Sequence, residues 1–436
     1  MSVILVLFFL VSGIIGGRYI FKAWMNSLTV YSFVMGGLTF LYELKLLPYP
    51  ELSFISWFYI ISSSIAFFIG IISVIFAKKL FPSRAENLRI KVSDMPIFKD
   101  DGKVLKYSVI FFSLVGLFVA LHRWYIMINI FGSIPSVFIN AAWVYRINVK
   151  GEIKEFIPIL PSFVYVGVFL SAIYTAYRGK FSFLSFFPII CIILKELTYF
   201  GRGEMLFSTL EFLFTFFLFR NLLNREDIKF KFSRKNAGFA ILLLIILVIT
   251  AASVVRTSRG IKENFRGATK ELKQLEENLI LTPSVYFYLS SDLGVLNQYL
   301  FKETEEANFG ENTFRGVYYL LSKIKIVDEP PFFQKGYFIP FWSNTGTFIR
   351  EIHADFGLLG VILVPFFLGV LLTYLWFRFF EEKNLIVLTV LVYLNLIIAF
   401  SFLVMVTRLN QWFLSQFLII LFLPVINKLA SKKILN

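Results

Sequence analysis

The sequence RTSRG at residues 256–260 closes one strongly apolar segment, and FIREIHADFGLLG at residues 348–360 leads into the next. Residues 256–355 form the only long stretch between apolar segments that is not itself apolar. Loops longer than about 12 to 15 residues are uncommon unless they carry a function or are disordered. This stretch contains aromatic residues, prolines and paired charges instead of low-complexity sequence. We therefore expect a folded element that carries the functional groups.

Composition places the chain among membrane proteins. Of its 436 residues, 58% are hydrophobic and 55 are phenylalanine, and the mean hydropathy is +0.74. This is too much apolar surface for a soluble domain. The net charge of +15 does not point to nucleic acid, because the basic residues form short tracts between apolar segments, where they orient helices and meet anionic headgroups. We expect membrane lipid, and no nucleic acid, as a partner.

Cysteine and histidine usage limits the chemistry. The single cysteine, Cys191, lies in an apolar segment and offers neither an intrachain disulfide nor a metal cluster. With only two histidines in the chain, we expect no metal and no cofactor. Residues 1–17 contain no Lys or Arg, so the charged n-region of a signal peptide is missing and this segment is expected to remain as a helix.

Apolar runs of about 20 residues can cross about 30 Å of hydrocarbon. The chain contains 11 candidates, at residues 2–17, 28–46, 52–77, 107–131, 159–177, 181–199, 204–220, 238–255, 356–378, 385–406 and 411–427. They predict an all-α polytopic membrane protein with about 11 transmembrane helices. Eight helices are expected in residues 1–255, a large loop in 256–355 and three helices in 356–436.

Charge asymmetry predicts the orientation. With the N-terminus outside, the inner loops hold 23 Lys and Arg residues and the short outer loops hold 5. Cytoplasmic loops carry the excess of basic residues, so the N-terminus and the long loop are expected in the periplasm and the C-terminus in the cytoplasm. The inner loops are too short for a cytoplasmic catalytic domain, so any chemistry is expected outside.

The long loop should contain an amphipathic helix. Apolar residues recur there at spacings of three and four, at Phe265, Ala268, Leu272, Leu275 and Leu279. Pro283 is expected to end this helix. We expect it to lie on the membrane surface or over the external mouth.

Three further blocks carry a family resemblance. The sequences GENTFR at residues 310–315, NTGT at 344–347 and DFGLLG at 355–360 resemble motifs of the Wzy-type oligosaccharide repeat-unit polymerases of bacterial surface polysaccharides. YFYLSS at 286–291 and GRG at 201–203 fit the same pattern. His353 departs from it. Related O-antigen ligases use a loop histidine, but His353 precedes the GLLG turn more closely than that pattern would place it.

The resemblance implies an enzyme of O-antigen or related lipopolysaccharide synthesis. Such a glycosyltransferase joins repeat units linked to undecaprenyl pyrophosphate on the outer face of the bacterial inner membrane. Its implied partners are lipid-linked oligosaccharide substrates and a chain-length-regulating co-polymerase.

This reaction requires a stabilised pyrophosphate, and arginine binds phosphate oxygens bidentately while staying charged. Headgroup binding is the alternative role for each basic residue. The candidates for pyrophosphate binding are Arg256, Arg259, Arg315 and Arg350 at the mouth of the loop, and Arg123, Lys195 and Arg202 within or beside the spans.

Two spacings add detail. Arg256 and Arg259 are three apart and should share a helix face, and Lys195 and Arg202, seven apart, should do the same. The alternative for Lys195 or Arg202 is an ion pair with Glu211, since ionisable groups in a span need a partner.

The reaction also needs a base for the acceptor hydroxyl. Glu351, His353 and Asp355 are the candidates, although Asp355 could instead cap a helix that starts at Phe356. Gly357 and Gly360 are expected to allow close helix packing.

Two other functions remain open. An O-antigen ligase would use similar lipid pyrophosphate chemistry. A lipid-linked oligosaccharide flippase should show pseudo-symmetric halves, and the sequence contains no repeat. A metal-dependent dolichol-type glycosyltransferase is disfavoured because residues 47–51 lack a pair of acids, so the enzyme is expected to be metal-independent.

Overall fold

The structure, a computed structural model, describes residues 2–80, 91–153, 157–225, 234–258, 260, 265–275, 282–302, 307–331, 334–403 and 405–432. These residues are nearly all α-helical, with one two-stranded antiparallel sheet among them. The chain forms two compact units, and each is described by itself. Unit 1 comprises residues 1–87, 263–378 and 393–413, and unit 2 comprises residues 88–262, 379–392 and 414–436.

Seven helical segments within the described ranges are long and apolar enough to cross a membrane, which supports a membrane-embedded protein. They are Val3–Phe21, Phe54–Leu80, Lys103–Phe131, Leu160–Arg178, Gly203–Asn224, Phe348–Glu382 and Asn410–Lys432. Of the other four expected spans, one coincides with α10, which has 25 residues, and three coincide with shorter apolar helices. The three shorter helices, α2, α8 and α15, have 17, 14 and 15 residues. At about 1.5 Å per residue they fall short of about 30 Å of hydrocarbon, so length alone does not give the expected 11 spans.

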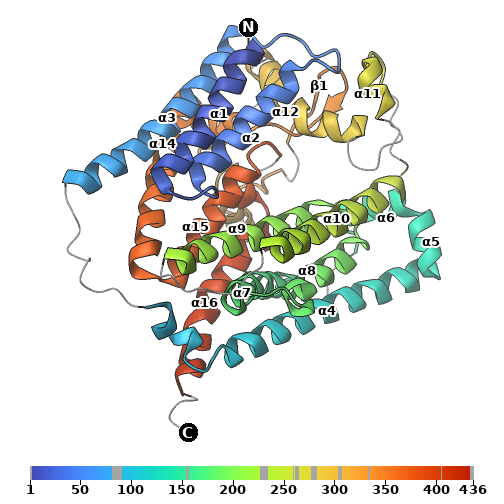
Figure 1. The fold of residues 1–436 in the computed structure, drawn as a ribbon. Coiled ribbons are helices and arrows are strands. Elements are labelled where there is room, and N and C mark those ends of the chain that lie inside the picture. The colour runs from blue at the N-terminus through green and yellow to red at the C-terminus, as the bar shows by residue number, and fades with distance from the viewer. Residues whose placement is uncertain are drawn as a thin grey trace. The chain divides into compact units, whose positions relative to one another are not determined.

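Unit 1 gathers helices from the two ends of the chain (Figure 1). Helix α1 packs on α2, and α12 packs on α2 and α3. The elements of unit 1 are α1 (Ser2–Phe21), α2 (Ser27–Glu43), α3 (Phe54–Leu80), α11 (Lys270–Gln274), α12 (Pro283–Lys302), α13 (Arg315–Lys323), β1 (Tyr337–Phe338), β2 (Trp342–Ser343), most of α14 (Phe348–Glu382) and the 3-10 turn η5 (Val406–Arg408).

Helices α3 and α14 approach closely through two glycines. A Cβ atom on Gly70 would lie 2.1 Å from the carbonyl oxygen of Phe366, and one on Gly369 would lie 2.3 Å from that of Phe67. Only glycine permits backbones this close.

The glycines expected to mediate packing have other roles. Gly357 has φ 63° and ψ −157° and marks a kink inside α14. A Cβ on Gly360 would clash with Phe356 and Ile352 of the same helix. The expectation of close packing at Gly357 and Gly360 is therefore wrong: close packing is found in the same helix, one to three turns further on.

An amphipathic helix was expected from Phe265 to Leu279. Within the described residues, the helix found there is shorter. Residues 265–268 form a turn with Gly267 at φ 83°, and α11 begins only at Lys270. Thr269 caps α11 by accepting a hydrogen bond from the backbone N–H of Leu272. Leu279 lies outside the described residues.

The end of the expected loop is also helical. Pro283 starts α12 instead of ending a helix, because proline fits the first helical position, where its missing N–H is not needed. Helix α14 begins at Phe348, so residues 348–355 are helical and do not belong to the loop.

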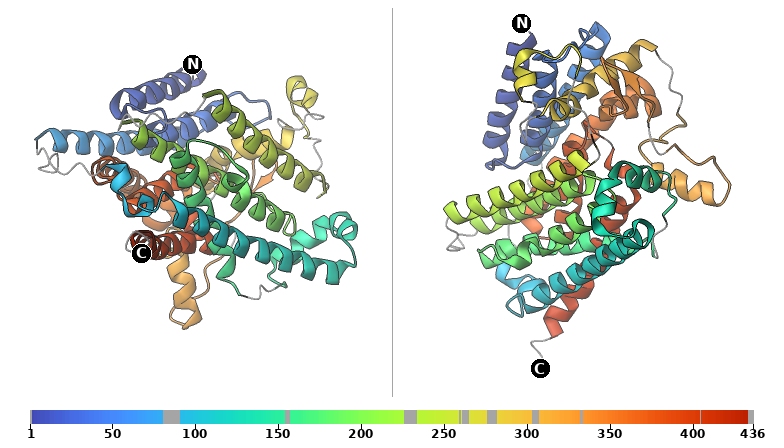
Figure 2. Two further views of the ribbon diagram at one scale, coloured as in Figure 1. Left: turned by 60° about the horizontal axis from the view of Figure 1, so that its bottom comes forward. Right: turned by 90° about the vertical axis from the view of Figure 1, so that its right-hand side faces the viewer.

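Unit 2 contains the helices from the middle of the chain, which run side by side in Figure 2 as the cyan and green ribbons. Helices α4, α7, α8 and α9 pack against one another. Its elements are η2 (Val92–Asp94), η3 (Pro96–Phe98), α4 (Lys103–Phe131), α5 (Ile134–Ile139), α6 (Ala141–Val149), η4 (Leu160–Ser162), α7 (Phe163–Arg178), α8 (Phe183–Glu196), α9 (Gly203–Arg225), α10 (Arg234–Ser258) and most of α16 (Asn410–Lys432). Helix α15 (Leu385–Ala399) is divided between the units.

Candidate functional site

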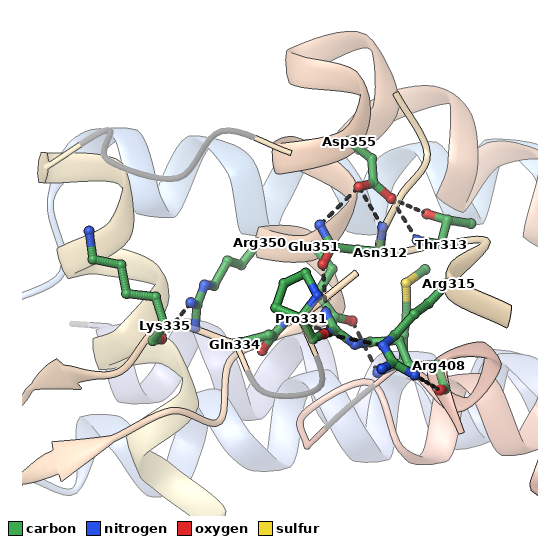
Figure 3. Close-up of polar contacts among 11 residues, drawn as sticks. Asn312, Thr313, Arg315, Pro331, Gln334, Lys335, Arg350, Glu351, Asp355 and Arg408 are labelled. Atoms are coloured by element: carbon green, nitrogen blue, oxygen red, sulfur yellow. Dashed lines mark hydrogen bonds and ion pairs between the residues drawn. The ribbon is translucent and has the colours of Figure 1, made fainter. Parts of the chain in front are cut away.

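The first turns of α14 form one side of a buried polar cluster in unit 1 (Figure 3). The other side comes from the turn before α13, from η5, and from Pro330, Pro331, Gln334 and Lys335. Five charged residues meet here: Arg315, Arg350, Glu351, Asp355 and Arg408. All are at most 5% exposed. Four of them were expected site residues, and Arg408 was not.

Asp355 is held by four hydrogen bonds. Its Oδ1 accepts from the backbone N–H and the side-chain amide of Asn312, both at 2.9 Å. Its Oδ2 accepts from the backbone N–H and the hydroxyl of Thr313, both at 2.7 Å. Asp355 thus fixes the turn that leads into α13 and does not cap a helix beginning at Phe356. These four donors offset part of the cost of burying a carboxylate.

Glu351 is paired with an arginine that is distant in sequence. Its Oε1 accepts from Arg408 at 3.4 Å and from the side chain of Gln334. Its Oε2 accepts from the backbone N–H of Met405 at 3.0 Å. Glu351 is 1% exposed, so it ties α14 to η5 in the interior of unit 1.

Arg408 and Arg315 bind the backbone of the same proline-rich segment. Arg408 donates to the Asn312 side chain at 2.5 Å and to the Pro331 carbonyl at 3.0 Å. Arg315 donates to the carbonyls of Pro331, Arg408 and Pro330 at 3.1, 3.3 and 3.3 Å. Burial, and then the charge of Arg408, lowers the pKa of Arg315. These guanidinium groups therefore organise the loop around them.

Arg350 lies beside two tyrosine rings. It is fully buried and donates to the carbonyl of Lys335 at 2.6 Å. Its guanidinium carbon lies 5.2 Å from the ring centre of Tyr337 and 5.8 Å from that of Tyr299, within the range of a cation–π contact.

His353 is the most accessible of the three expected bases. It is partly exposed, whereas Glu351 and Asp355 are buried. Its Nδ1 lies 2.8 Å from the hydroxyl of Tyr299 and its Nε2 lies 3.2 Å from the hydroxyl of Tyr59. Tyr299 thus contacts both His353 and Arg350. An imidazole between two hydroxyls can hold a proton on either ring nitrogen.

Asp292, in α12 of unit 1, was missed by the sequence analysis. It is completely buried, and neither carboxylate oxygen makes a hydrogen bond to the described residues. Burial raises its pKa to about 8, although the nearby backbone N–H groups of Leu293 and Asp292 oppose the shift. Asp292 directly follows the aromatic segment at residues 286–291, but nothing in its spacing predicts burial.

Two of the expected basic residues of unit 2, Lys195 and Arg123, share a polar cluster around Tyr199. Lys195 is 2% exposed and pairs with Glu204 at 2.5 Å, and Glu204 also accepts from the hydroxyl of Tyr165 at 2.8 Å. The proposed pair with Glu211 is thus wrong for Lys195, since Glu204 at the start of α9 is the partner. Arg202 lies before α9 and after the end of α8, so it does not share a helix face with Lys195.

Arg123 occupies the same region of unit 2. It is 1% exposed, donates to the side chain of Asn148, and stacks on Tyr199 with 4.1 Å between its guanidinium carbon and the ring centre. Its Nε and Nη1 are buried and make no hydrogen bond to the described residues. A buried guanidinium with unsatisfied donors suits an anion or water.

Two of the arginines expected at the loop mouth are not part of unit 1 as it is described. Arg256 belongs to α10 in unit 2, and Arg259 lies outside the described residues. Of the four arginines expected at the loop mouth, unit 1 brings together Arg315 and Arg350. The arginine that joins them, Arg408, could have been suspected because it is the one charge in a four-residue link between apolar runs.

Comparisons with known proteins add no relative. The chain has no significant match to a protein-family model, a curated protein or a solved structure. In the described part of the chain, no three His, Cys, Asp or Glu residues are grouped so that they could hold a metal ion. Metal independence remains a prediction.

Proposed function

We propose that this membrane protein is a glycosyltransferase that polymerises oligosaccharide repeat units linked to undecaprenyl pyrophosphate, on the outer face of the bacterial inner membrane. The observation that carries the proposal is the contact of Tyr299 with both His353 and Arg350. It combines a partly exposed imidazole with a buried guanidinium at the start of a helix that is apolar enough to cross a membrane.

Each group has a role in the proposed reaction. The acceptor hydroxyl attacks the anomeric carbon of the donor, and the bond from that carbon to the pyrophosphate oxygen breaks. His353 takes the proton of the hydroxyl, directly or through Tyr59. The pyrophosphate leaves with the electron pair of the broken bond. The positive charge of the arginines stabilises this leaving group. Glu351, Asp355, Arg315 and Arg408 position the loop around this site, a narrower role than the direct one expected of Glu351, Asp355 and Arg315.

A ligase is the second candidate, and His353 is the observation that favours it. Both enzymes would activate a hydroxyl against the same class of donor and differ in the acceptor. In a flippase, the contact of Tyr299 with His353 and Arg350 would have no role.

Deletion of the gene separates the three functions. Surface polysaccharide reduced to single repeats indicates a polymerase, lipid-linked polymer that never reaches the surface indicates a ligase, and intermediates trapped in the inner leaflet indicate a flippase. We expect single repeats.

The substitution H353Q then tests the site in a polymer-length assay at matched protein abundance. Loss of a general base costs about 10² to 10⁴ in rate, so the ladder of chain lengths should collapse. H122Q, which changes the other histidine of the chain, is the matched control and should leave the ladder intact. A normal ladder from H353Q would remove His353 from the mechanism.

A further inference from the structure

A cavity of about 550 Å³ lies in unit 2 where α4 begins, α7 ends and α8 begins. Three cations line it, Lys106 from the first turn of α4, Arg178 from the last residue of α7, and Lys180 from the link to α8. Polar and apolar groups therefore meet in one hollow, since Ile110 and Phe187 also line it.

The cations are not neutralised by the surrounding protein. Lys106, Arg178 and Lys180 are exposed and make no hydrogen bond or ion pair within the described ranges. Among the residues that the structure describes, no acidic residue lines the cavity. The acids at the start of α4 have other partners, since Asp100 accepts from the backbone N–H of Val104 at 2.6 Å and Asp101 is hydrogen-bonded to Tyr177. The described lining of the hollow therefore carries three positive charges and no negative one.

The cavity lies at the end of two candidate spans. The span Lys103–Phe131 begins beside the cavity, and the span Leu160–Arg178 ends beside it. Lys and Arg at such ends lie at the level of the lipid headgroups. The start of α8 adds to the positive charge at the cavity. Phe183 and Leu184, the first residues of α8, line the cavity. A helix N-terminus carries unpaired N–H groups and a partial positive charge.

We propose that this cavity binds an anionic phospholipid. Lys106, Arg178 and Lys180 hold the headgroup phosphate, and the hydrocarbon chains lie along Ile110 and Phe187. Basic pockets between membrane helices have the chemistry that anionic headgroups require. The charge asymmetry of the loops assigns the lipid to the cytoplasmic leaflet. The proposal is independent of the glycosyltransferase function.

The test is native mass spectrometry of the full chain in detergent, titrated with phosphatidylglycerol or with phosphatidylcholine. We expect saturable binding of phosphatidylglycerol, and about 30-fold weaker binding by R178Q/K180Q, because each cation contributes about 1 kcal/mol and a tenfold change in affinity is about 1.4 kcal/mol. The control K428Q/K432Q removes the same charge from exposed positions on α16 outside the cavity lining and should bind as the unchanged protein does.

Three results would overturn the proposal: equal affinity for the two lipids, unchanged binding by R178Q/K180Q, or an equal loss in the control, which would mean a diffuse surface charge. The swap R178K/K180R keeps both charges and should retain binding. If it bound no lipid despite an unchanged unfolding temperature, phosphate recognition by these cations would also be wrong.

Discussion

The two buried carboxylates show why single residues at the site could be named from the sequence while their roles could not. Glu351 and Asp355 were expected to act on substrate, yet each is buried and bound by protein donors. Their partners are distant along the chain, 57 positions away for Arg408 and 43 for Asn312. Sequence spacing identifies neighbours on one helix, but it contains no information on which remote side chain will meet a carboxylate.

The pair of Glu351 and Arg408 gives a prediction about stability. Removing one partner of a buried ion pair costs about 3 to 5 kcal/mol, whereas replacing both with apolar groups costs much less. We expect E351M and R408M each to lower the unfolding temperature of the protein in detergent, and the double variant to lose less than the two combined. Strictly additive losses would mean that the two charges do not depend on each other.

Asp292 gives a prediction about pH. Its pKa is about 8 in the folded protein against an ordinary value of 3.8. Between these values the folded protein keeps a proton that the unfolded chain releases, so the unfolding free energy falls as pH rises through this window, by up to about 1.4 kcal/mol per pH unit. The effect is absent below pH 3.8 and complete above pH 8.

The isosteric variant D292N isolates this effect. It should show a shallower loss of stability than the unchanged protein between pH 5 and pH 9, and the two should converge at the acidic end. Thermal unfolding at several pH values measures the difference. Parallel pH profiles would assign the proton to another group.

At the scale of elements, apolar runs predicted helices well. Each of the 11 expected spans coincides with a helix, because about 20 apolar residues have few other ways to satisfy their backbone in a membrane. Helix α12 was not anticipated. A proline such as Pro283 can either follow the end of a helix or begin one, so it did not identify the start of α12. The helix also packs on α2 and α3, which come from another part of the chain.

The kink in α14 provides the prediction at this scale. Gly357 combines φ 63° with ψ −157°, a region that is essentially confined to glycine and costs other residues about 1 to 3 kcal/mol. G357A should therefore lower the unfolding temperature. The control is G37A, since Gly37 is helical and has open space around it, where alanine gains about 1 kcal/mol of helix propensity. If G357A does not lower the unfolding temperature more than G37A does, the backbone at Gly357 is not strained for other residues.

For the whole molecule, the distribution of charge predicts the topology. A reporter that works only outside the cytoplasm should be active when inserted near Asn308 and inactive when fused after Asn436. The asymmetry of 23 basic residues to 5 motivates this orientation. Both fusions must be made in the full chain and compared at equal abundance, and an active C-terminal fusion would reverse the assignment.

The four hydrogen bonds of Asp355 have a mechanical consequence. They fasten the turn at Asn312 and Thr313 to the short helical segment before the kink, two residues ahead of Gly357. The span beyond Gly357 is anchored separately, backbone against backbone, on α3. The two parts of α14 are thus held by different neighbours, and position 357 is the point at which a hinge between them would be centred.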